Sequence, residues 1–190
     1  MGTFLVVVLG TAAVILVYGI LIYNNLVSLK HNVSKAWSNI DVLLKQRHDE
    51  LPKLVETCRQ YMKFEQETLE RVMRARAQVQ VARESRDIPA LGQAEGALRL
   101  GLGSLYAVAE AYPELKTNET FRHLQARITE LENAIADRRE FYNESVNVNN
   151  VCVEQFPDNF VAGMFGFRLA QLLEFQAEEK ADVNVGKLFA

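Results

Sequence analysis

The chain has 190 residues, a formal net charge of −3 at pH 7 and only two cysteines. This weakly acidic balance provides no general attraction to nucleic acid, so no nucleic-acid partner is expected. Cys58 and Cys152 occur in neither a C-x-x-C nor a metal-ligand spacing. The composition therefore excludes a basic nucleic-acid-binding domain and a small secreted disulfide scaffold.

Residues 4–23 form a run of twenty positions without a charged side chain, and the first charged side chain is Lys30. At about 1.5 Å per residue, a helix of this length spans a hydrocarbon core of roughly 30 Å. A cleaved signal peptide would have a basic start, a shorter apolar core and a small-x-small cleavage site. A buried core helix is the remaining alternative. We predict that residues 1–23 are a transmembrane anchor.

Basic residues follow this run, and none precedes it. Lys30, Lys35, Lys45 and Arg47 lie on its C-terminal side. Because cytoplasmic flanks carry the excess of Lys and Arg, we predict a single-pass protein with its N-terminus outside and its body in the cytoplasm.

The rest of the chain has helical periodicity, and its four prolines punctuate it. Pro52, Pro89, Pro113 and Pro157 suggest boundaries, because proline disrupts a helix interior. We predict helices at about 24–50, 52–86, 90–112 and 118–156. Short connections between four helices predict an all-α antiparallel four-helix bundle within residues 24–167. The polar residues 168–190 are predicted to form a poorly ordered tail.

Within this scheme, the apolar residues of each helix recur at intervals of three, four, seven or eight. The predicted core stripes are Leu26, Val33, Trp37, Ile40 and Leu44; Leu54, Cys58, Tyr61, Leu69, Val72 and Val79; Leu91, Ala94, Leu98, Gly101, Leu105, Val108 and Tyr112; and Phe121, Leu124, Ile128, Leu131 and Ile135. The last stripe turns polar at Tyr142 and Asn149. These polar residues either specify register in the bundle or an oligomer, or lie on an exposed helix end.

An up-and-down bundle of four helices returns the chain to the membrane after its fourth helix. The segment 156–167 that follows is unusually rich in aromatic and sulfur-containing side chains, and we call it the Phe-rich segment. Three roles are open for it: insertion at the membrane interface, covering the end of the bundle, and docking a partner. The candidate interface or partner residues are Phe156, Phe160, Met164, Phe165 and Phe167.

Three blocks of sequence carry a family resemblance. The first block begins at Tyr23 and reads YNNLVSLKHNVSKAWSNIDVLLKQRHDELPKLV. The second begins at Leu105 and reads LYAVAEAYPELKTNETFRHLQ. The third begins at Phe141 and reads FYNESVNVNNVCVEQFPDNFVAGMFGF. Together they resemble the LemA family of bacterial membrane proteins. The resemblance implies an N-terminal membrane helix, a bundle of long helices and a location in the bacterial inner membrane. LemA genes often neighbour those of membrane proteases, which implies such a protease as one partner. The family has no agreed activity, so the resemblance supplies no catalytic residues.

Motifs for catalysis are not found. His31, His48 and His123 are preceded at the third position by Ser28, Lys45 and Thr120, so the Glu-x-x-His pairs of di-iron bundles are missing. Zinc-protease, phosphate-loop and nucleophile-elbow motifs are missing as well. We predict no catalytic residue, cofactor or metal. The favoured function is a non-enzymatic membrane-anchored scaffold or adaptor that self-associates or recruits membrane proteins. A self-assembling protein that remodels or organises lipid is the alternative, and an envelope-related hydrolase is the least favoured.

Overall fold

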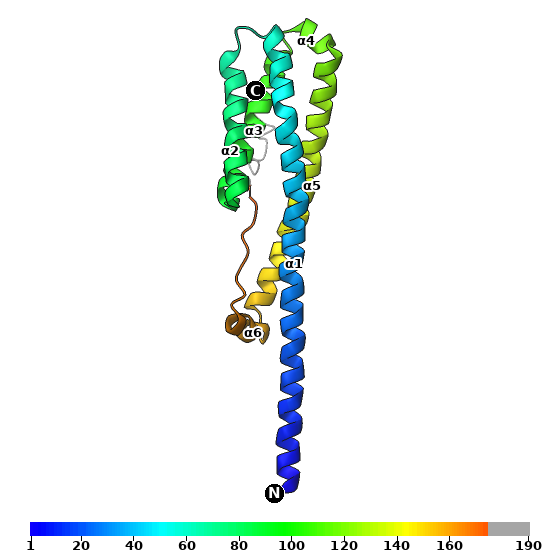
Figure 1. Cartoon of the computed structure of the whole chain (residues 1–190), viewed down its shortest axis with the longest axis vertical. Helices are drawn as coiled ribbons and strands as arrows, with labels where there is room; N and C mark the ends of the chain where they lie inside the picture. The colour runs from blue at the N-terminus through cyan, green and yellow to red at the C-terminus, as the bar shows by residue number, and fades with distance from the viewer. Residues whose placement is uncertain (175–190) are drawn as a thin grey trace, which may run out of the picture. The chain divides into compact units, whose positions relative to one another are not determined.

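The computed structural model describes residues 1–174, which contain six helices and no strand. They are α1 (Gly2–Tyr61), α2 (Gln66–Ser85), α3 (Ile88–Ala109), α4 (Pro113–Thr117), α5 (Glu119–Glu154) and α6 (Asp158–Phe165) (Figure 1). The predicted all-α class is confirmed. Residues 175–190, most of the predicted polar tail, lie outside the described residues.

The chain divides into two compact units, and helices α1 and α5 contribute to both. Unit 1 comprises Met1–Ile40 and Arg138–Leu172, and unit 2 comprises Asp41–Asp137 and Leu173–Ala190. Unit 1 therefore combines the first part of α1 with the end of α5, α6 and the segment that follows it. Unit 2 contains the remainder of α1 and α5 together with α2, α3 and α4.

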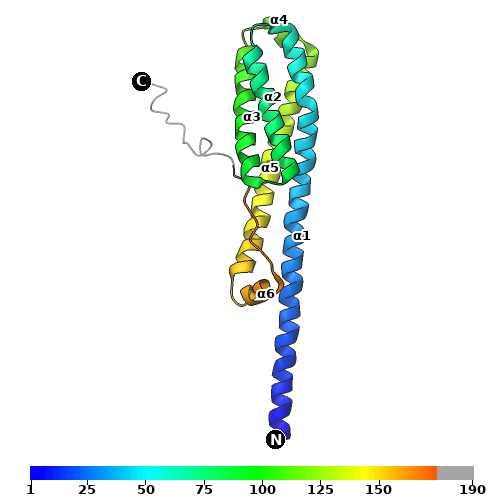
Figure 2. The same ribbon diagram turned by 60° about the vertical axis from the view of Figure 1, so that its left-hand side comes forward.

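Unit 2 is built from helical segments of α1, α2, α3 and α5 that lie side by side in both views (Figures 1 and 2). Their predicted apolar stripes are largely buried. The side chains exposed by no more than three per cent include Leu44, Leu54, Cys58, Leu69, Val72, Leu91, Leu98, Leu105, Phe121, Ile128 and Leu131. A helix with an apolar stripe must bury it against neighbours, so these stripes explain why the segments pack.

The connections in unit 2 use the expected local chemistry. Arg86 ends α2 in a left-handed conformation, and the Asp87 carboxylate then accepts the Ala90 N–H at 3.0 Å to cap α3. Asn118 does the same for α5, because its side-chain oxygen accepts the Phe121 N–H at 2.9 Å. These caps place the starts of α3 and α5 within two residues of the predicted starts at 90 and 118.

The predicted helix boundary at Pro52 is wrong. Helix α1 continues through Pro52 to Tyr61, and the break before α2 falls at residues 62–65. A proline in a helix leaves the carbonyl four residues earlier without its N–H partner. Here that carbonyl belongs to His48, and the side chain of Arg76 from α2 donates to it at 2.9 Å through Nε. The helix therefore continues because α2 supplies the hydrogen bond that proline cannot.

We expect Arg76→Ala to lower the free energy of unfolding by about 1–3 kcal/mol, because it leaves the His48 carbonyl unsatisfied. In a Pro52→Ala background the same substitution should cost much less, since the introduced alanine has a backbone N–H that bonds this carbonyl. Arg76 also contacts the His48 ring, but that loss is common to both backgrounds and cancels in the difference. Denaturant unfolding of the detergent-solubilised full chain measures the free energy of unfolding of the four variants in this double-mutant cycle. An equal loss from Arg76→Ala in the two backgrounds would contradict the prediction.

Unit 1 packs α6 and an extended segment against α1 and α5. The extended segment follows α6 and is fixed to α5 by polar contacts. The Asn150 amide donates to the Ala170 carbonyl at 2.9 Å and accepts the Ala170 N–H at 2.8 Å. The Tyr142 hydroxyl donates to the Gln171 carbonyl at 2.9 Å. Polar residues at the end of α5 thus bind the chain's own extended segment, a role that the seam pattern did not predict.

In unit 2, the described chain ends against α3. Leu173 is buried, and the backbone of Glu174 crosses α3 at Gly92. A Cβ atom at Gly92 would clash with the carbonyl oxygen of Glu174, whereas one at Gly96 would meet open space. An extended backbone therefore approaches α3 closely at Gly92.

The pair Gly92→Ala and Gly96→Ala tests this contact. Both substitutions raise helix propensity, and we expect Gly96→Ala to stabilise the protein by up to about 1 kcal/mol. Gly92→Ala should not give this stabilisation, because its Cβ would displace the segment around Leu173. Hydrogen–deuterium exchange of the peptide that covers this segment provides the measurement. Identical exchange and identical stability in the two variants would show that the close approach is unimportant.

Candidate functional site

The first part of α1 exposes its apolar side chains instead of burying them. Between Phe4 and Leu21, the large apolar residues are 47% to 75% exposed. Among residues 1–174, α1 is the one helix long and apolar enough to cross a membrane. Apolar surface in water costs about 25 cal/mol per Å², so a surface of this extent calls for a covering environment.

Helix α6 lies beside α1 within unit 1 (Figures 1 and 2). Its first residue, Asp158, is buried and accepts a hydrogen bond from the side chain of Gln155. Gly166 ends it in a left-handed conformation with a φ of 70°, and the following Phe167 N–H then bonds the Ala162 carbonyl at 2.9 Å. Glycine suits this position because it has no Cβ.

One side of α6 packs against α1 just after the apolar run. Ala162 forms a buried cluster with Ile22 and Leu26 of α1, and the half-buried residues packed against this cluster are Cys152, Val153, Val161 and Phe167. The Tyr23 ring contacts two aromatic rings of the Phe-rich segment, with centroids 4.7 Å from Phe165 and 5.8 Å from Phe167. The segment is therefore placed at the end of residues 4–23.

The opposite side of the segment is exposed. Phe156 is 78% exposed, Phe160 69% and Met164 80%. Phe160 and Met164 lie four residues apart within α6, a spacing that aligns side chains along one face of a helix, and Phe156 lies in the turn just before α6. The Phe156 and Phe160 rings contact each other edge to face, with centroids 5.9 Å apart. We call Phe156, Phe160 and Met164 the outward face of the segment.

The five predicted residues therefore fall into two groups. Phe165 and Phe167 contact the Tyr23 ring, although Phe165 remains 58% exposed. The ring contacts of Tyr23 include no residue of the outward face. From the sequence alone, a helical spacing of four residues could have placed positions 156, 160 and 164 on a different face from position 167. It could not have identified Tyr23 as the partner, because no pattern in the sequence connects residues so far apart.

Unit 2 contains a buried polar cluster that the sequence analysis missed. Arg47 of α1 and Glu95 of α3 form an ion pair at 2.5 Å, with both side chains only 4% exposed. A cavity of about 110 Å³ beside them is lined by Arg99 and Glu132 as well. Two guanidinium groups and two carboxylates balance in charge, which is the composition of a structural ion pair network.

The signal for this cluster was present in the sequence. Arg47 lies three residues after Leu44 and four before Leu51, so it stands on the apolar stripe of its helix. Glu95 occupies the equivalent position between Leu91 and Leu98. A charged residue on each of two buried stripes indicates a pair. Burial raises the pKa of Glu132, against the opposing influence of Arg47 and Arg99.

The reactive side chains of unit 2 are held in unreactive environments. Burial raises the pKa of the Cys58 thiol to about 12, which keeps it protonated at neutral pH and unsuited to nucleophilic attack. Burial and the Arg76 guanidinium lower the pKa of His48, whose Nε2 lies 2.6 Å from Arg76 Nη2. His48 therefore contacts α2.

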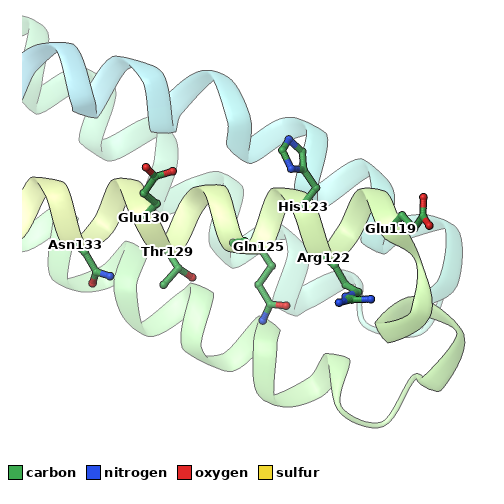
Figure 3. A pocket seen from close by; sticks show the side chains of 8 residues that line it. Glu119, Arg122, His123, Gln125, Thr129, Glu130 and Asn133 are labelled. Carbon is green, nitrogen blue, oxygen red and sulfur yellow. The ribbon is translucent and has the colours of Figure 1, made fainter.

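A shallow hollow of about 860 Å³ lies on the outer side of α5. Its lining comes entirely from that helix: Glu119, Arg122, His123, Gln125, Ala126, Thr129, Glu130 and Asn133. Figure 3 shows these side chains spreading to different sides of the helix without converging on a common point. Catalysis requires groups that meet around a reacting atom, so this hollow has no arrangement for it. Among residues 1–174, no cluster of His, Cys, Asp and Glu could hold a metal ion.

Comparisons with known proteins give one family and a small group of relatives. The sequence profile of the LemA family matches residues 36–186. Magnetosome proteins MamQ 1 and MamQ 2 of Paramagnetospirillum magneticum are each 34% identical to the chain over 96 residues. MamQ of Magnetospirillum gryphiswaldense is 33% identical over 79 residues. These matches cover 50%, 50% and 42% of this chain but only 35%, 35% and 29% of the relatives, so the similarity spans about a third of their length.

Proposed function

We propose that this protein, which belongs to the LemA family, is a non-enzymatic scaffold anchored in the bacterial inner membrane. Residues 4–23 would cross the bilayer once, and the helices of unit 2 would bind further copies of the chain or other membrane proteins. A membrane protease is one such partner class. The observation that carries the proposal is the exposed, charge-free surface of α1 in a chain whose other helices bury their apolar stripes.

Two further observations support this proposal. Two polar pairs of unit 2 join different helices, Arg47 with Glu95 and Arg76 with His48. The relatives are named for a cellular structure and not for a reaction. Lys30 and Lys35 on the C-terminal side of the apolar run support an outside N-terminus and a cytoplasmic unit 2.

Anchoring and orientation can be tested on the full chain in bacterial cells. We expect the protein to stay in the membrane fraction after alkaline carbonate extraction, because a spanning helix is not held by charge. Protease should digest unit 2 in inside-out membrane vesicles but not in right-side-out ones. A photo-crosslinking residue at the exposed Leu100 of α3 should capture a second copy or a membrane protein.

Recovery of a chain in the aqueous fraction that begins after residue 23 would contradict the anchor. The scaffold role has its own counter-evidence. A strictly monomeric protein whose function survives charge reversal across the exposed surface of unit 2 would contradict partner binding while leaving the anchor intact.

A second candidate function is the organisation or remodelling of lipid by self-assembly. The outward face of the Phe-rich segment favours it, because this face is apolar and lies at the end of the proposed span. Lateral packing of many copies would then shape the bilayer around them.

For this candidate we expect reconstituted protein to change the shape of lipid vesicles, as seen by electron microscopy. Replacing Phe156, Phe160 and Met164 with serine should abolish the change. The matched control replaces Val42, Phe64 and Val81, which are exposed apolar residues of unit 2, and should leave the change intact. Vesicles that keep their shape with the unsubstituted protein would eliminate lipid remodelling as a function.

A further inference from the structure

We propose that α6 is an interfacial helix, whose outward face enters the boundary between headgroups and acyl chains in the leaflet where the span ends. The ligand of Phe156, Phe160 and Met164 is then phospholipid, and the chain has a second lipid contact besides its span. This inference rests on the proposed function, because it requires residues 4–23 to lie in the bilayer.

The first observation that supports this inference is the position of α6 along α1. Tyr23 ends the stretch 4–23 and is followed by the polar Asn24 and Asn25, and tyrosine rings favour the headgroup level at the end of a span. Two rings of the Phe-rich segment contact Tyr23, and Ala162 of α6 is buried against Ile22 and Leu26. The residues that mark the end of the span therefore also hold α6 against α1.

The orientation of α6 carries the second step. Its packed side is occupied by the cluster with α1, so Phe156, Phe160 and Met164 face away from it. Between Asp158 and Arg168 no charged residue interrupts the segment. Asp158 is buried, and Arg168 is exposed directly after the segment, where a basic side chain suits the headgroup region. An amphipathic helix of this kind lies in the interface plane.

The attachment of α6 at both ends carries the third step. Helix α5 leads into α6 through the short turn at Pro157, and the extended segment beyond α6 is bound by Asn150 and Tyr142. Because both ends are fixed within unit 1, α6 is held at one place along α1. The outward face is thus presented at the end of the span before any lipid binds.

Lipid is a better occupant of this face than a protein partner or a bundle end. Covering the bundle would bury the outward face, and all three of its side chains are more than two-thirds exposed. A protein partner would have to reach this face at the headgroup level, where lipid is already present at high concentration. The exposed apolar surface of residues 4–21 also continues through Tyr23 to Phe165, which is 58% exposed, so one environment covers both.

Depth-dependent fluorescence quenching tests this inference on the full chain. The native Trp37 is first replaced by Phe, and one tryptophan is then introduced in each variant, at Phe160 of α6, Leu16 of the span or Leu100 of unit 2. Each variant is reconstituted into vesicles of phosphatidylcholine and phosphatidylglycerol that contain brominated phosphatidylcholine. The lipids carry bromine either near the headgroup end of the acyl chain or near its terminal methyl.

We expect bromine near the headgroup end to lower the emission of Phe160→Trp about twofold, with less quenching by bromine near the terminal methyl, since interfacial helices lie about 5–10 Å deep. Leu16→Trp should be quenched more by the deeper bromine. Leu100→Trp is the matched control, because Leu100 is also an exposed apolar residue, and its emission should not change.

Quenching of Leu16→Trp without quenching of Phe160→Trp would overturn the interfacial role of α6 and leave the anchor standing. Absence of quenching in Leu16→Trp would overturn the anchor, and the inference with it. If Phe160→Trp is unquenched in vesicles and a photo-crosslinking residue at the same position captures a second copy, the outward face is a protein interface and the proposal is wrong.

Discussion

The continuity of α1 depends on one hydrogen bond from a neighbouring helix. Pro52 leaves the His48 carbonyl without a partner, and Arg76 of α2 donates to that carbonyl from outside the helix. Because α1 continues, Leu54 and Cys58 remain on the stripe that packs into unit 2. Without this bond, the helix would be free to end near residue 50, and the last turns of α1 would contribute nothing to the core.

Unit 1 shows a different balance of forces, because it leaves the apolar side chains of residues 4–21 and much of the Phe-rich segment exposed. Its cluster around Ile22, Leu26 and Ala162 is small, and polar contacts from Asn150 and Tyr142 fix the extended segment. Covering a side chain such as Phe or Met fully is worth about 1.5–3 kcal/mol, so the exposed residues of α1 and α6 represent a large unmet driving force. In the proposed anchored state, lipid covers these exposed side chains.

Most of the fold could be predicted from sequence because it depends on local patterns. The stripes that include Leu91, Leu98 and Leu105 follow from helical periodicity, and the Asn118 cap follows from side-chain chemistry. Pro52 could not be placed correctly, because its effect is reversed by Arg76, which is distant in sequence. The apolar run was evident from composition alone, since no helix of a water-soluble bundle needs twenty uncharged residues in succession.

The candidate site was only partly predictable for related reasons. The Phe-rich segment was conspicuous by composition, but α6 is too short for periodicity to define, and its contact with Tyr23 is tertiary. The bond between Asn150 and the Ala170 backbone has no sequence signature, because any residue at position 170 except proline offers the same N–H and carbonyl.

The buried charges of unit 2 connect the fold to the proposed function. Replacing a buried ion pair by apolar residues is often neutral or stabilising, so Arg47 and Glu95 are not explained by stability alone. A long helix with a repeating apolar stripe can shift along its neighbour by one turn at little cost, and a pair joining α1 to α3 penalises every shifted alignment. A scaffold needs a fixed surface more than a reactive one. In the described part of unit 2, the Arg47–Glu95 pair accordingly aligns two helices, while the exposed apolar side chains of unit 1 gather on the proposed span and α6.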